Sequence, residues 1–189
     1  MAGAAATRGQ QVRRQLLAAA AELIPQLGWS AVSTRTLAQR AGVTPSVVHY
    51  HFPSLQAVLQ EAALGAMRRA TAELEASLSS AGPQELIDSA LAAMRPYTGA
   101  DPTTVLFVEA YLAGLRDQHF GAAIADLLTH SRGRLAQRLA EDDVADPDGT
   151  AAVVFAALDG LVLHRGLGVG PDPARATALR RIVAAGGAR

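Results

Sequence analysis

Residues 34–51 hold a cluster of side chains suited to binding nucleic acid. Hydroxyls, two guanidinium groups, two imidazoles and a phenol occur there close together. Such groups donate hydrogen bonds to phosphate oxygens, and near the start of a helix they reach base edges in a DNA major groove. We therefore expect DNA contacts from the following residues: Thr34, Arg35, Thr44, Pro45, Ser46, His49, Tyr50 and His51, together with Arg14 from the preceding helix.

Two short helices joined by a turn would hold these side chains in place. Ser33 is a hydroxyl residue of the kind that caps a helix, and Gly42 supplies the backbone freedom for a sharp turn. Thr44 followed by proline is typical of a helix start. Val48 and Phe52 lie four residues apart, so they can anchor the second helix through one face and leave the polar side chains on the other. The pattern predicts a helix-turn-helix.

This stretch and the helix before it resemble the DNA-binding domain of the TetR family of bacterial regulators. The family's elements appear here as LLAAAAELIPQLGW, STRTLAQR, AGVTPSVV and HYHF, and the resemblance covers the first third of the chain. Two positions depart from the family pattern. His49 stands where tyrosine is usual, and Leu55 stands where a phosphate-binding lysine is common. Arg14 and Arg35 are candidates to replace that phosphate contact.

The distribution of charge also favours DNA binding, although the net charge of the 189 residues is zero. Residues 1–70 hold seven arginines against Glu22 and Glu61, which gives a net charge of +5. Residues 71–189 hold ten arginines against fifteen acidic residues, which gives −5. A basic segment beside an acidic one is the electrostatic pattern expected of a DNA-binding module attached to a domain of another kind.

The sequence argues against an enzyme, a secreted protein and a membrane protein. It has no cysteine, no G-x-S-x-G elbow, no phosphate-binding loop and no H-E-x-x-H motif. His49 and His51 are two residues apart and point to different sides of a helix, so we expect no metal and no cofactor. The opening residues lack the apolar stretch of a signal peptide, and the longest apolar run, 151–163, is too short to span a membrane. We predict a soluble cytoplasmic protein.

The remaining pattern predicts an all-α fold of about nine helices in two domains. The first domain, residues 1–53, is the helix-turn-helix domain with a flexible arm at its start. The second domain, residues 54–189, begins with a long connecting helix over 54–79. Proline preceded by glycine or aspartate marks later helix starts, and the helices predicted beyond residue 80 are 83–97, 102–118, 120–141, 147–166 and 173–185.

The second domain has scattered polar and aromatic residues on apolar helices, which fit a filled core as well as a ligand pocket. The resemblance implies a pocket enclosed by the helices that start near residues 83, 102 and 120. The residues expected to line it are Met94, Tyr97, Phe107, Tyr111 and Phe155.

The resemblance also implies that the last two helices of two copies form a four-helix bundle. The residues expected at that dimer interface are Phe155, Leu158, Asp159, Leu161, Val162, Leu179 and Ile182. Asp159 stands in the apolar run AALDGLVL, where an unpaired carboxylate is costly to bury. We expect it either to face solvent or to pair with an arginine such as Arg165 or Arg181.

Together these features predict a homodimeric transcriptional regulator that binds a two-fold operator in double-stranded DNA. We expect a repressor that a small, mostly apolar effector releases from the operator. Two other functions are also consistent with the sequence. One is a DNA-binding regulator controlled by a protein partner. The other is a helical adaptor or small-molecule-binding protein that does not bind DNA, for which Leu55 is the one hint.

Overall fold

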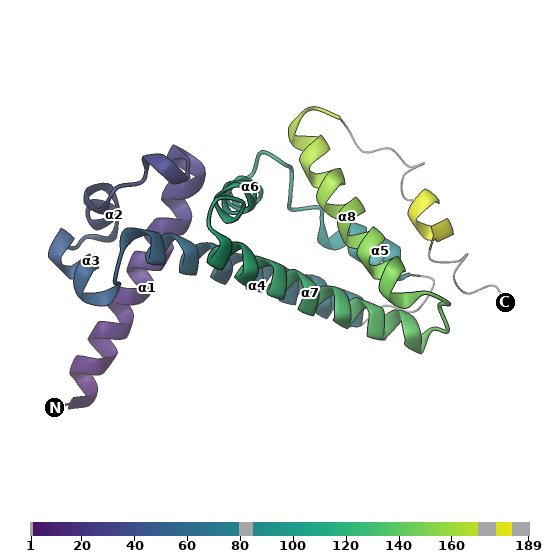
Figure 1. Ribbon diagram of the computed structural model, residues 1–189, viewed down its shortest axis with the longest axis horizontal. Coiled ribbons are helices and arrows are strands. Elements are labelled where there is room, and N and C mark those ends of the chain that lie inside the picture. Colours follow the sequence, from purple (N-terminus) through teal and green to yellow (C-terminus); the bar gives the residue numbers. More distant parts are fainter. Residues whose placement is uncertain (1, 80–84, 170–176, 183–189) are drawn as a thin grey trace. The chain divides into compact units, whose positions relative to one another are not determined.

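The chain folds into helices, which confirms the predicted all-α fold class (Figure 1). The computed structural model describes residues 2–79, 85–169 and 177–182, and these residues form no strand. Residues 177–182 are helical. The other elements are α1 (Ala2–Leu27), the short 3-10 helix η1 (Trp29–Ala31), α2 (Thr34–Ala41), α3 (Pro45–His51), α4 (Leu55–Ser79), α5 (Leu86–Ala93), α6 (Pro102–Gly114), α7 (Gln118–Glu141) and α8 (Pro147–Gly166).

Two of the predicted aspartate–proline helix starts are confirmed. Asp101 and Asp146 precede the prolines that begin α6 and α8. Each aspartate accepts a hydrogen bond from the backbone N–H three residues later, at 3.0 Å in both cases. These bonds satisfy N–H groups that have no partner within the helix. The two other predicted starts, at residues 82–83 and 172–173, lie outside the described residues.

Three predicted boundaries were wrong. The opening residues were predicted to form a flexible arm, but α1 already begins at Ala2, in an alanine-rich stretch with high helix propensity. Helix α5 ends at Ala93 rather than at residue 97, since Pro96 disfavours helical backbone at the residue before it. Helix α6 ends at Gly114, where the backbone lies so close to Gly121 that a Cβ on Gly121 would come within 2.6 Å of the Gly114 carbonyl oxygen.

The helices form two compact units, and each unit is built from two separate segments of the chain. The first unit contains Met1–Met67 and Val105–Ile124, and the second contains Arg68–Thr104 and Ala125–Arg189. The chain therefore passes from one unit to the other within α4, α6 and α7. The predicted domains, 1–53 and 54–189, stay a prediction, whereas the units are defined by which residues pack together.

The first unit has a core built by apolar faces of α1 to α4. Leu16 and Ile24 of α1 are fully buried, as are Leu37 of α2 and Val58 of α4, and all four belong to this unit. Helices α1, α2 and α3 lie against one another in Figure 1. Phe120 at the start of α7 is buried as well, so a segment far away in sequence completes the core.

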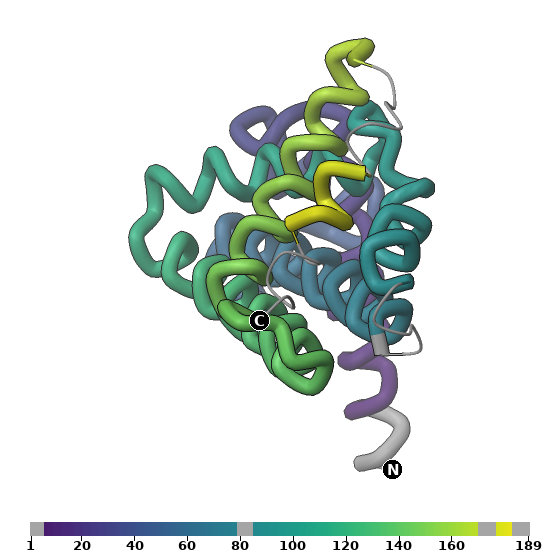
Figure 2. Tube along the Cα trace, turned by 90° about the vertical axis from the view of Figure 1, so that its right-hand side faces the viewer, coloured from purple at the N-terminus to yellow at the C-terminus, as the bar shows by residue number. Residues whose placement is uncertain are grey.

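The second unit has its own core. The second half of α4 contributes Leu74, which packs with residues from α5, α7 and α8, and with Leu179 from the segment 177–182. That segment lies beside α8 in Figure 2. Gly99 and Gly166 bring the loop before α6 against the end of α8, since a Cβ on either glycine would come within 3 Å of the other segment's backbone. Only glycine fits such an approach.

Candidate nucleic-acid interface

Helix α2 begins and ends as its local sequence predicts. The Ser33 hydroxyl accepts a hydrogen bond from the Thr36 N–H at 3.1 Å, and the Ser33 N–H donates to the Thr36 hydroxyl at 2.9 Å. This reciprocal capping satisfies two N–H groups at the helix start. Gly42 ends the helix with φ of +69°, in the left-handed region where glycine is favoured. Local residues therefore define the turn between α2 and α3.

Helix α3 is anchored by one face and presents polar side chains on the other. Val48 and Phe52 are buried, while Thr44, Ser46 and His49 are exposed. The Thr44 hydroxyl does not cap the helix, contrary to expectation; it bonds the Ser46 hydroxyl at 2.9 Å instead. Both hydroxyls thus lie together at the exposed start of α3.

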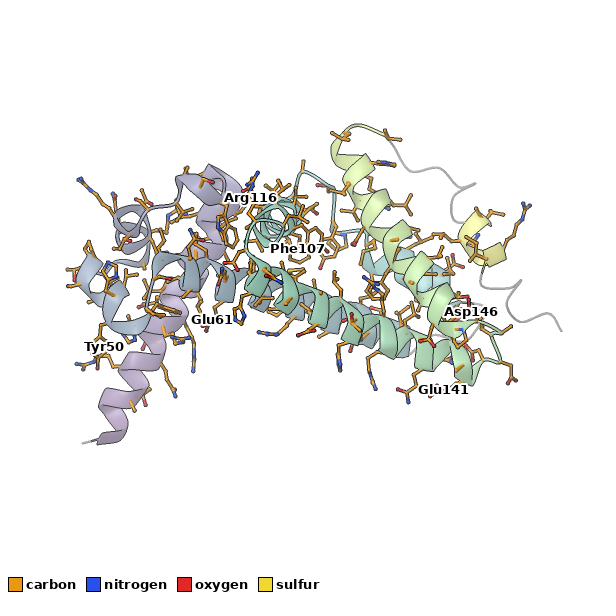
Figure 3. The ribbon with its side chains drawn as sticks, viewed as in Figure 1. Tyr50, Glu61, Phe107, Arg116, Glu141 and Asp146 are labelled. Carbon is orange, nitrogen blue, oxygen red and sulfur yellow. The ribbon has the colours of Figure 1, made fainter. Side chains whose placement is uncertain are left out.

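Tyr50 is the most prominent side chain of α3. It is 86% exposed and projects away from the helix (Figure 3). Its neighbour His51 is half-buried, and the two rings meet edge to face with centroids 5.1 Å apart. Of the other residues expected to contact DNA, Pro45, Arg35 and Arg14 are exposed and Thr34 is half-buried. A large exposed aromatic ring on an anchored helix is available for contact with a base or a phosphate.

Arg13 supports α3, a role that the sequence analysis missed. Its guanidinium donates to the His51 carbonyl oxygen at 3.0 Å, forms an ion pair with Glu61, and lies 4.1 Å from the centre of the Phe52 ring. The signal was available, because Arg13 precedes the buried Leu16 by three residues and so lies at the edge of the same helix face. Arg13 ties α1 and α4 to the end of α3.

The turn between α1 and α2 is held by residues far from it in sequence. Gly28 has φ of +83°, and the Trp29 N–H that follows donates to Glu109 Oε2 of α6 at 2.7 Å. The Trp29 indole N–H donates to Gln56 Oε1 of α4 at 2.9 Å. Its ring lies 5.4 Å from that of Phe120, measured between centroids. Three segments outside the helix-turn-helix therefore hold this turn.

A cleft of about 510 Å³ opens beside the same turn. At its rim Gln60 donates to Asp117 Oδ2 at 2.8 Å. The backbone N–H of Phe120 donates to Asp117 as well and is the main cause of a pKa below the usual aspartate value. The cleft is lined by α1 and η1 residues, by Gln56 and Gln60 of α4, and by the following residues of α6 and α7 or between them: Glu109, Leu112, Ala113, Arg116, Asp117 and Phe120.

Two protein-family models match the chain, and they divide it in sequence order rather than by the two packed units. Residues 16–62 match the model described as bacterial regulatory proteins, tetR family. Residues 81–185, more than half of the chain, match the model described as Tetracyclin repressor-like, C-terminal domain. The chain belongs to the TetR family. It is a transcriptional regulator with the helix-turn-helix DNA-binding fold of that family. No curated protein matches the chain in sequence.

Solved structures support the TetR fold over almost the whole chain. A protein from Streptomyces coelicolor A3(2), described as a transcriptional regulator, is 29% identical with a TM-score of 0.79, covering 92% of this chain and 98% of its own. The multidrug binding protein EbrR, complexed with imidazole, is 27% identical with a TM-score of 0.69, covering 92% and 93%. A Saccharomonospora viridis protein in complex with choline is 22% identical with a TM-score of 0.71, covering 93% and 95%.

The residues expected to bind an effector fall into both units. Met94, Tyr97 and Phe155 belong to the second unit, and Phe107 and Tyr111 belong to the first. Phe155 is a core residue, while the other four are half-buried. Their role stays a prediction.

Tyr97 lies in an environment that disfavours its ionisation. Burial raises the pKa of its phenol above the usual value, and the carboxylates of Glu73 and Asp101 raise it further. Arg165 of α8 donates to the Met94 and Tyr97 carbonyl oxygens at 3.0 and 3.3 Å. These bonds hold the residues after α5 against the end of α8.

The residues expected at the dimer interface divide by exposure. Phe155, Leu158, Val162 and Leu179 are buried within one chain, Leu161 is half-buried, and Asp159 and Ile182 are exposed. Val153 and Leu163, which were not among the predicted interface residues, are 48% and 42% exposed on α8. They lie ten residues apart, about 2.8 helical turns, so their side chains point about 80° apart around the helix. Both lie on the exposed side of α8 in the single chain.

Asp159 does not pair with Arg165, which bonds the carbonyl oxygens of Met94 and Tyr97 instead. Although the Asp159 side chain is exposed in the single chain, the surrounding protein removes enough water to raise the pKa of its carboxyl. The positive charge of Arg132 on α7 opposes that rise in pKa. The carboxylate is therefore less favoured here than in water.

Two further findings concern metal sites and membrane-spanning helices. Among residues 2–79, 85–169 and 177–182, no group of three or more histidine, aspartate or glutamate side chains lies close enough to hold a metal ion. None of the helices described is both long enough and apolar enough to cross a membrane.

Proposed function

We propose that this TetR-family regulator is a homodimeric repressor whose α3 enters the major groove of a two-fold operator. Thr34, Arg35 and Thr44 bond the phosphate backbone, and Ser46 and Tyr50 contact base edges. The single observation that supports this most is the exposure of Tyr50 on a helix whose opposite face is buried. A rigidly anchored helix with a free polar face presents its side chains to DNA in one arrangement.

The proposed dimer explains the uncovered face of α8. Val153 and Leu163 would pack against the same helix of a second copy, with Asp159, Leu161 and Ile182 beside them. Phe155, Leu158, Val162 and Leu179 would support this surface from below. A two-fold dimer places two copies of α3 at the spacing of successive major grooves.

The proposed effector is a small, mostly apolar molecule bound near Met94, Tyr97 and Phe155 of the second unit. Two similar proteins are in complex with small molecules, choline and imidazole, which supports a small-molecule effector in general. The effector would favour a dimer whose two α3 helices are spaced differently. If it binds that state about 100-fold more tightly, it opposes DNA binding by about 2.7 kcal/mol, enough to release an operator.

The test is selection of binding sites from fragmented genomic DNA with purified full-length protein at a stated salt concentration. We expect a palindromic site, and repression in a reporter assay when that site is placed over a promoter. A palindrome that gives activation would contradict the repressor. If no site is recovered by folded, dimeric protein, DNA reading by this chain is wrong and the helical adaptor becomes the better description.

The effector is tested separately with the recovered duplex. Screening small apolar and amphipathic compounds for release of the duplex should identify a class that weakens binding. A protein whose affinity for the duplex is unchanged by every compound that it binds would argue for control by a protein partner.

A further inference from the structure

The loop that leads into the helix-turn-helix has an unusual support. Its first residue after the positive-φ Gly28 is Trp29, whose backbone N–H is the first of η1 and has no acceptor within that short helix. The Glu109 carboxylate supplies the acceptor at 2.7 Å, from a position 80 residues later in the chain. Hydrogen bonds to a charged group are stronger than those between neutral groups. This hydrogen bond is therefore a specific interaction between α6 and the turn rather than incidental packing.

The hydrogen bond between Trp29 and Glu109 lies close to the start of α2 and can affect its position. Only Val32 and Ser33 lie between η1 and the first residue of α2, and Val32 is buried. Thr34 and Arg35, two of the residues proposed to bond phosphate, occupy the first turn of that helix. A displacement at Trp29 would thus be transmitted almost directly to the phosphate-binding end of α2.

Glu109 gives Trp29 a charged hydrogen-bond partner, and the two other contacts described for Trp29 are with uncharged side chains. The indole is held by the neutral side chain of Gln56 and by the ring of Phe120. The Glu109 carboxylate lies 3.8 Å from the place where a Cβ of Gly28 would be, so it packs directly over the turn. All these residues belong to the first unit.

We propose that Glu109 is a positioning residue for DNA binding, which holds the α1–α2 turn in the conformation that presents α2 and α3 to the operator. Glu109 lies in the part of the chain that matches the C-terminal family model, yet it packs with the DNA-binding helices. A turn that is ordered before DNA arrives costs no ordering free energy on binding. The inference rests on the proposed operator binding by α3.

The test compares two substitutions of equal size in the full-length protein. Glu109→Gln removes the charge but keeps an oxygen that can accept from the Trp29 N–H, whereas Glu109→Met removes the acceptor as well. We expect Glu109→Met to weaken affinity for the duplex that the wild-type protein selects by about tenfold, and Glu109→Gln to weaken it much less. Affinity is measured by fluorescence anisotropy at fixed salt, at a temperature where each variant is fully folded.

The two variants separate positioning from other roles of Glu109. If the carboxylate merely repelled DNA, both variants would bind more tightly and equally. If Glu109 only stabilised the fold, both melting temperatures would fall without a difference in operator affinity. Equal affinities of the Met and Gln variants would overturn the proposal.

A second measurement needs no DNA. Amide hydrogen exchange at Trp29 should accelerate in Glu109→Met and stay close to wild type in Glu109→Gln, because only the first variant leaves the N–H without an acceptor. Unchanged exchange in the Met variant would also overturn the proposal. Tyr50→Ala serves as the control for operator binding. If that variant binds the duplex as well as wild type, the proposed function fails, whatever Glu109 does.

Discussion

In the first unit, the side chains proposed to contact DNA lie mostly on exposed helix surfaces, whereas the second-unit side chains proposed to bind an effector, Met94, Tyr97 and Phe155, are half-buried or belong to the core. Tyr50 is 86% exposed on α3, but Phe155 packs among the core residues of the second unit. The chemistry of the side chains does not explain this contrast, because both are large aromatic residues. Their surroundings do.

This contrast shows why one kind of site is easier to recognise in a sequence than the other. A DNA-reading helix must combine a buried face with a polar face, and the two faces follow from helical spacing. A pocket for an apolar molecule is lined by the same residue types that fill a core. Met94 and Tyr97 are half-buried and Phe155 is buried, which spacing along a helix does not predict.

The largest expected effect comes from truncating one buried side chain in the core of each unit. Leu37 in the first unit and Leu139 in the second are both fully buried, so changing either to alanine should cost about 2–5 kcal/mol of unfolding free energy. Trp29 is the single tryptophan, and its fluorescence reports on the first unit. In urea, Leu37→Ala should shift the fluorescence transition more than Leu139→Ala does. Equal shifts in fluorescence and far-ultraviolet circular dichroism for both variants would mean that the units unfold together.

A smaller effect separates the reading surface from the core beneath it. Tyr50→Ala should weaken operator binding by about 1–3 kcal/mol and leave the free energy of unfolding almost unchanged, since the ring is exposed. The measurements are duplex affinity at fixed salt and urea unfolding. His130→Ala, at an exposed position of α7 in the second unit, is the matched control and should change neither. A stability loss in Tyr50→Ala as large as its affinity loss would show that the ring supports the fold.

The smallest expected effect is electrostatic and concerns the second unit alone. Burial by itself raises the pKa of Asp101, but hydrogen bonds from Thr104, Thr98 and Gly99 outweigh it and hold the pKa below the usual aspartate value. A lowered pKa in the folded state stabilises the protein above the unfolded pKa of about 4, and this stabilisation is lost as the pH falls through the folded value. The stability advantage of wild type over Asp101→Asn should therefore shrink below pH of about 4.

Urea unfolding at a series of pH values measures that difference. Asp126→Asn, an exposed carboxylate on α7, is the control for loss of a charge. An advantage of wild type over Asp101→Asn that stays constant down to the acid transition would mean that the hydrogen bonds matter only for local geometry.

Local rules determined much of the DNA-binding unit from the sequence. Ser33 and Gly42 act within four residues of their own positions, through a cap and a turn, and Val48 and Phe52 lie four residues apart on one helix face. Such interactions depend on the order of nearby residues, so the helix-turn-helix was predictable before its packing was known. One local detail departs from these rules, because the Thr44 hydroxyl bonds the Ser46 hydroxyl instead of capping α3.

Only the tertiary structure decided which distant residues meet. The sequence by itself predicted an all-α TetR-family protein with a helix-turn-helix and the residue types on the exposed face of α3. It did not indicate that Glu109 would bond Trp29 across 80 residues, or that Arg165 would hold the carbonyls of Met94 and Tyr97. The physical reason is that these contacts depend on how whole helices pack, and many arrangements satisfy the same helical periodicity. Packing likewise decided which apolar residues of the second unit became core and which stayed exposed on α8.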